Sequence, residues 1–229
     1  MKSKILNSKA YQVFDYICRL VILNLLLVII SFSIFIIMIN IFPNMKNVYR
    51  ILCLIPTALN FLPCFVAIAD VIKGYEIEKN TGIFKEFFTS FKKHFSKASL
   101  LSVLLIVCIL LIGNSVSFFS TMQSAGVIYT IGLGLSLSLV LVLIIGFIHM
   151  PLVMIYFDDL KLIHYIKLSL IFGFKDIGLT LLLTLFVIGT IVLSYLFSLY
   201  LVILAFSLVI YLIIKLTKNK YFKISERNK

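Results

Sequence analysis

Charged residues are scarce in this sequence. They make up 13% of its 229 residues, against about 25% in a typical soluble domain. Hydrophobic residues make up 62%, and the mean hydropathy is +1.16. Because so few charged groups cannot cover the surface of a soluble domain, the composition excludes a soluble protein. It indicates an integral membrane protein.

Catalytic and metal-binding motifs are also missing. The sequence has no H-E-x-x-H, G-x-S-x-G or Walker A motif and no paired membrane aspartates. Its three histidines and nine carboxylates are too few and too scattered for a metal or acid–base site. We therefore expect no enzyme activity, no metal and no cofactor. Four cysteines stand in or beside apolar runs without C-x-x-C spacing, which is typical of small buried apolar residues: Cys18, Cys53, Cys64 and Cys108.

Acidic residues are outnumbered, with 9 Asp and Glu against 21 Lys and Arg. A net charge of +12 can indicate a nucleic-acid partner. Here the basic residues cluster beside apolar runs, where they orient a chain in the bilayer, so we expect no nucleic acid. The first run, Leu20 to about Phe42, is longer than the roughly 7–15 apolar residues of a signal peptide. We expect it to be a retained first span.

The uncharged stretches predict an all-α fold, a polytopic transmembrane helical bundle of six spans in one membrane domain, 1–229. A span needs about 20 apolar residues. The sixty uncharged residues at 98–157 are therefore divided at STMQSAG (120–126), and the thirty-eight at 177–214 are divided near SYLFSLY (194–200). The expected spans are about 20–42, 51–72, 98–119, 127–157, 177–194 and 197–215.

The distribution of basic residues orients the six spans. With both termini on one side, that side carries nineteen Lys and Arg, and the other side has only Lys46 and Arg50. Basic residues favour the cytoplasmic side of a membrane. We therefore expect both termini in the cytoplasm.

Residues 82–97 form the first of two expected cytoplasmic surface helices. Five phenylalanines fall within an arc of about 100° on a helical wheel, and lysines occupy much of the rest. This pattern is typical of an amphipathic helix at a membrane surface, or of one that docks a protein partner. The candidate residues for either role are Phe84, Phe87, Phe88, Phe91, Lys92, Lys93 and Phe95. A second, more apolar surface helix is expected at about 159–174.

Polar groups inside spans are the candidates for an intramembrane site. Pro56 and Pro63 each remove a backbone donor from the second span, and Asn60 lies between them. Such a helix can line a transport path, or Asn60 can bond a carbonyl freed within a kinked helix.

Further polar groups stand alone in the apolar runs. Asp70 can pair with Lys73 near the cytoplasmic end of the second span. For His149 we weigh titration near neutrality against an interhelical hydrogen bond. Asn114 is a third candidate. Small residues that favour close packing, within the chain or with a partner, recur in the fourth span: Gly132, Gly134, Ser136 and Ser138.

Three features follow one another in this part of the chain: IPTAL, a charged connector after AIAD, and the pattern F-x-x-F-F-x-x-F-K-x-x-F, here residues 84–95. With them, residues 11–105 resemble the YesL-like family of bacterial integral membrane proteins of unknown function. Members are commonly encoded beside carbohydrate uptake systems, notably ABC importers. The resemblance therefore implies a protein of the bacterial cytoplasmic membrane, accessory to carbohydrate uptake, with the lipid bilayer and ABC importer permease subunits as partners. The alternatives are a self-contained small transporter or channel and a structural or immunity-type membrane protein.

Overall fold

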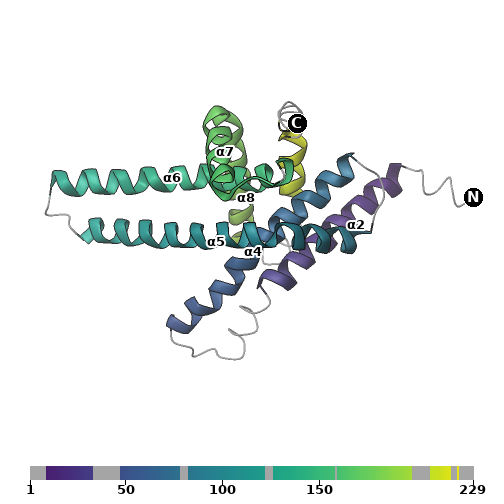
Figure 1. Ribbon diagram of the computed structural model, residues 1–229, viewed down its shortest axis with the longest axis horizontal. Helices are drawn as coiled ribbons and strands as arrows, with labels where there is room; N and C mark the ends of the chain where they lie inside the picture. Colours follow the sequence, from purple (N-terminus) through teal and green to yellow (C-terminus); the bar gives the residue numbers. More distant parts are fainter. Residues whose placement is uncertain are drawn as a thin grey trace, which may run out of the picture.

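Helices make up the described part of the molecule, which a computed structural model gives for residues 9–32, 47–77, 82–121, 126–157, 159–197, 207–217 and 221 (Figure 1). These residues contain no strand. The helices are α2 (Lys9–Leu27), which continues as a π-helical turn η1 (Val28–Phe32), α4 (Asn47–Ile77), α5 (Ile83–Thr121), α6 (Val127–Tyr156), α7 (Leu162–Lys175), α8 (Ile177–Phe197) and an unlabelled helix, Ser207–Thr217. The predicted all-α membrane fold is confirmed.

Two long antiparallel helices, α5 and α6, run side by side, and α2 and α4 cross the N-terminal half of α5 obliquely (Figure 1). The buried core lies at this crossing. It includes Val66–Ala69 of α4, Phe87 of α5 and Leu152–Ile155 of α6. The rest of α5 and α6 extends away from the crossing as a hairpin (Figure 1). We call residues 103–121 and 127–145 the arm.

Helix α5 corrects one sequence expectation. A surface helix at 82–97 and a separate span at 98–119 were expected, but 83–121 is one continuous helix. The sequence around Lys97 and Ala98 has no Gly or Pro to end a helix. At about 1.5 Å per residue the helix is about 58 Å long, and a hydrocarbon core is only about 30 Å thick. The amphipathic segment therefore shares the axis of the span that follows it.

The number of spans is close to the expected six. Four helices are long and apolar enough to cross a membrane, and a bent pair from α7 and α8 makes up to five. The expected fourth span at 127–157 coincides with α6 (Val127–Tyr156). Of the expected first span, 20–42, the structure describes residues 20–32. Of the expected sixth span, 197–215, the structure describes mainly the short helix Ser207–Thr217.

Helix α7 occupies the place of the second expected surface helix and meets α8 at a bend of 99°. Its exposed face carries His164 and Lys167, whereas Tyr165 and Phe172 are buried. Helix α7 packs mainly on α6, which covers one side of its wide apolar arc. Ile163, Ile171 and Phe174 on the other side are exposed.

Candidate functional site

Polar side chains meet inside the crossing of α4, α5 and α6. Ser90 Oγ donates a hydrogen bond to Asp70 Oδ2 at 2.7 Å, and His94 Nε2 lies 3.8 Å from the same oxygen. Ser90 and His94 are buried, and the Asp70 side chain is 28% exposed. Lys73 donates to the backbone carbonyl of Ile155 in α6. Asp70 thus contacts α5 and Lys73 contacts α6, so these two residues of α4 connect it to both neighbouring helices.

Cations stand over tyrosine rings around this crossing. Three pairs have a charged group 4.6–5.8 Å from the ring centroid: Arg19 with Tyr75, Lys73 with Tyr156, and Lys97 with Tyr165. Tyr156 and Tyr165 are buried in the bundle, whereas Tyr75 is half-buried. The Lys73 and Lys97 pairs therefore join helices within the bundle. The Arg19–Tyr75 pair has the partly exposed setting in which tyrosine and basic side chains meet lipid headgroups.

The five phenylalanines of the amphipathic segment do not share one environment. Phe87 is fully buried in the core. Phe84, Phe88 and Phe95 are 41–56% exposed, and Phe91 is half-buried. The face of α5 turned to the core is instead made by Phe87, Ser90, His94 and Ala98. The segment thus has a core face, an exposed phenylalanine edge and a basic face.

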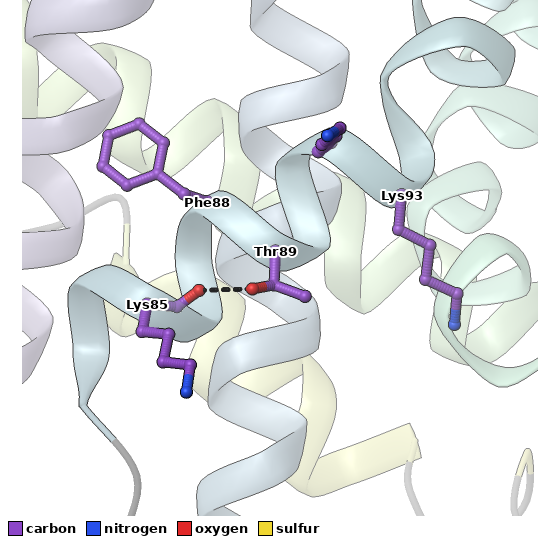
Figure 2. Close-up of a pocket in the computed structure, with 5 residues that line it drawn as sticks. Lys85, Phe88, Thr89 and Lys93 are labelled. Carbon is purple, nitrogen blue, oxygen red and sulfur yellow. Dashed lines mark hydrogen bonds between the residues drawn. The ribbon is translucent and has the colours of Figure 1, made fainter.

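The basic face borders an open depression of about 550 Å³, lined by Lys85, Phe88, Thr89, Lys92 and Lys93. Figure 2 shows Lys85 and Lys93 projecting from α5 on either side of Thr89, with Phe88 pointing another way. Thr89 Oγ1 donates to the carbonyl of Lys85, a bond within the helix. Lys85, Lys92 and Lys93 are the charged residues that line this depression.

Polar groups in the proline-rich part of α4 find hydrogen-bond partners within α4 and on α5. Asn60 Nδ2 donates to the carbonyl of Pro56 at 3.0 Å. Pro63 has no N–H for the carbonyl of Leu59, and Ser99 of α5 donates to that oxygen at 3.3 Å. Pro63 itself is buried. These contacts match the interpretation of a kinked, packed helix, and the transport path through Asn60 stays a prediction.

His149 lies at the centre of a buried hydrogen-bond chain. Its Nε2 is 2.8 Å from Thr180 Oγ1, and its Nδ1 is 2.7 Å from the Tyr221 hydroxyl. Thr180 donates its only proton to the carbonyl of Gly173 or Asp176 at the α7–α8 bend. His149 Nε2–H is then the donor to Thr180, and Nδ1 accepts from Tyr221. The histidine is a structural link between these elements, and burial raises the pKa of the Tyr221 hydroxyl.

The sequence did not identify the partners in two of these contacts. Thr180 and Tyr221 lie 31 and 72 residues from His149. Asn24 likewise pairs with Ser207: its amide donates to Ser207 Oγ at 2.8 Å and accepts from Ser207 N at 2.9 Å. Lone polar residues in apolar spans indicate such contacts, but only the folded chain identifies their partners.

Asn114 differs from the other intramembrane candidates because it is exposed on the arm. It makes no hydrogen bond with the part of the chain that the structure describes. The small residues of the fourth span separate into two faces: Gly132 and Ser136 are buried toward α5, whereas Gly134 and Ser138 are exposed. One face of small residues on α6 thus packs within the arm, and the other face is exposed.

No group of three or more His, Cys, Asp or Glu side chains that could hold a metal is found within the described ranges. Cys18, Cys64 and Cys108 are free thiols.

Residues 20–115 match the model of a protein family described as "Protein of unknown function, DUF624". YesL-like proteins belong to that family, so the match supports the resemblance at this coarser level. The comparisons with curated proteins and with solved structures gave no match. The chain is thus a helical membrane protein that is similar, over its first half, to a family without an assigned activity.

Proposed function

We propose that this chain is an accessory membrane subunit that packs through its arm against the permease of a carbohydrate importer. The resemblance to YesL-like proteins supports the carbohydrate part of the proposal. We place the chain in the bacterial cytoplasmic membrane with both termini in the cytoplasm, on the strength of its nineteen-to-two distribution of basic residues. The role requires no catalysis by the chain itself.

The observation that carries the docking part is the low burial of the arm helices. In the most apolar stretch of each candidate span, only 17% is buried in α5 and in α6, compared with 59% in α4. Lipid can cover such faces, but an exposed amide is costly in hydrocarbon unless it finds a partner. Asn114 is such an amide, and Gly113 beside it has open space where a Cβ would stand. An amide next to a glycine suits close contact with another membrane helix.

The exposed face of α6 supports the same contact. A Cβ built on Gly134 would meet nothing within 4 Å, and Ser138 uses its hydroxyl within its own helix. By contrast, a Cβ on Gly132 would come 2.4 Å from Phe119, because there α5 and α6 already touch. One small-residue pair thus closes the hairpin, and the second remains available for a partner helix.

Site-specific photocrosslinking in the native membrane tests this proposal. A photoreactive residue replaces Leu110 on the arm, 57% exposed, or as a matched control Ile163 on α7, 65% exposed. We expect an adduct with a sugar-importer permease from position 110 only, and slower uptake of at least one sugar when the chain is deleted. If position 110 yields no transporter adduct and uptake of a sugar panel is intact after deletion, the proposal is wrong.

A further inference from the structure

The basic face of α5 lies at the depth of the membrane interface. Two hydrogen bonds fix the level of α5 against α4: Ser99 contacts the carbonyl of Leu59, and Ser90 contacts Asp70. The two helices are therefore antiparallel here, and the N-terminal end of α5 lies beside the C-terminal end of the candidate span Ile55–Tyr75. The basic face thus lies alongside the end of α4 that carries Tyr75.

The Arg19–Tyr75 pair gives the same level independently. Arg19 stands over the half-buried Tyr75 ring at the end of the α4 span. Tyrosine and basic side chains gather at the boundary between hydrocarbon and headgroups. Lys85 lies alongside this end of α4, and Lys92 and Lys93 follow it by about two turns of the same helix. Their long side chains can reach lipid phosphates while the helix remains packed on the bundle.

The exposed phenylalanine edge borders the basic face. Phe84 and Phe88 are 56% and 51% exposed, and Phe88 lies three residues after Lys85 and four before Lys92, so it is next to both on the helix surface. Apolar rings next to ammonium groups complement a lipid, whose acyl chains and phosphate meet at this depth. Lys85, Lys92 and Lys93 line one depression with Thr89, and Figure 2 shows Lys85 and Lys93 on either side of Thr89.

We propose that Lys85, Lys92 and Lys93, together with Phe88, form a binding site for the phosphate headgroups of anionic phospholipids. The phosphate oxygens accept hydrogen bonds from the ammonium groups, and the acyl chains lie along the phenylalanine edge. The site is independent of the proposed docking through the arm, because it lies on the opposite end of α5.

Nanodiscs of stated composition provide the test. The full chain is placed in pure phosphatidylcholine or in a mixture with phosphatidylglycerol, and its melting temperature and the lipids it retains on extraction are measured. We expect phosphatidylglycerol to raise the melting temperature and to be retained selectively. Each lysine near an anionic surface accounts for about a fivefold change in affinity, so Lys85→Gln/Lys92→Gln/Lys93→Gln should weaken retention about a hundredfold.

Three controls separate the site from general charge effects. Lys161→Gln/Lys167→Gln/Lys175→Gln removes three exposed lysines from α7 and should leave retention nearly unchanged. Replacement of Lys85, Lys92 and Lys93 by arginine should preserve retention. Inorganic phosphate should not compete, since it lacks the acyl chains, and competition by it would reassign the site to a soluble anion.

Equal phosphatidylglycerol retention by the parent chain and the α5 triple variant would overturn the proposal. So would an equal loss in the α7 triple variant, because the effect would then follow net charge. If the α5 variant keeps its lipid but loses a co-purifying acidic protein, the basic face binds a protein and the lipid site is wrong.

Discussion

The crossing of α4 with α5 and the arm are built from similar residues but face different surroundings. The span in α4 contains two prolines, Asn60 and Asp70, yet 59% of it is buried. The arm helices are more apolar, and only 17% of each span is buried. Polar groups in α4 find partners on neighbouring helices, whereas the arm turns apolar side chains outward. In this protein, the more apolar spans are therefore the less packed ones, as expected for a lipid or partner interface.

The largest effect is expected where the packed region holds a buried hydrogen-bond chain. His149→Leu leaves the buried Tyr221 hydroxyl without its partner, which should cost about 2–3 kcal/mol of unfolding free energy. Unfolding by SDS titration in mixed micelles measures the loss. Because His164 is exposed, His164→Leu should change stability by less than about 0.5 kcal/mol.

The double variant His149→Leu/Tyr221→Phe sharpens this prediction. Removing both polar groups should recover part of the loss, since an unpaired buried donor costs more than a missing bond. No recovery would mean that packing, and not the hydrogen bond, gives His149 its effect.

A glycine pair tests the close contacts directly. A Cβ on Gly173 would stand 2.2 Å from Ile145 Cγ2, so Gly173→Ala should destabilise by about 1–3 kcal/mol. Gly134 in the arm has open space, and there alanine should be neutral or slightly stabilising through its helix propensity. Thermal unfolding in detergent compares the two variants. Equal destabilisation would contradict the difference between the packed region and the arm.

Two serines provide a smaller test. Ser90→Ala removes a hydrogen bond to the Asp70 carboxylate and should cost about 1–2 kcal/mol. Ser138 donates only to the carbonyl of Gly134 in its own helix, so Ser138→Ala should have little effect. Should the two variants prove equally stable, the polar contact at the crossing does not hold α4 and α5 together.

The smallest effect concerns pH. Desolvation by burial is the largest cause of the raised pKa of Tyr221, and Asp176 adds to it. The unfolded tyrosine ionises near pH 10, whereas the folded one stays protonated at higher pH. Its contribution is present below about pH 10 and is lost as the pH rises further, by at most about 1.4 kcal/mol per unit. Stability curves of the parent chain and Tyr221→Phe should converge above pH 10, and parallel curves would contradict this.

The sequence predicted individual helices better than the contacts between them. The expected span at 127–157 agrees with α6 because the charge-free run and the turn before it set its limits. The sequence did not predict that 82–97 and 98–119 form one continuous helix. The amphipathic pattern changes to an apolar one near residue 98, and such a change indicates different surroundings for the side chains, not an end of the helix. The partners of His149 and Asn24 depend on packing over 31 to 183 residues, which periodicity does not encode.

Co-purification of the importer permease with arm variants tests the central claim most directly. Asn114→Leu removes an exposed amide and Gly134→Leu fills open space, so the chain should fold normally while the permease no longer co-purifies in mild detergent. Gly178→Leu at the start of α8 is an equally open control and should retain the permease. Retention of the permease by both arm variants, or its absence from the parent chain, would contradict the account.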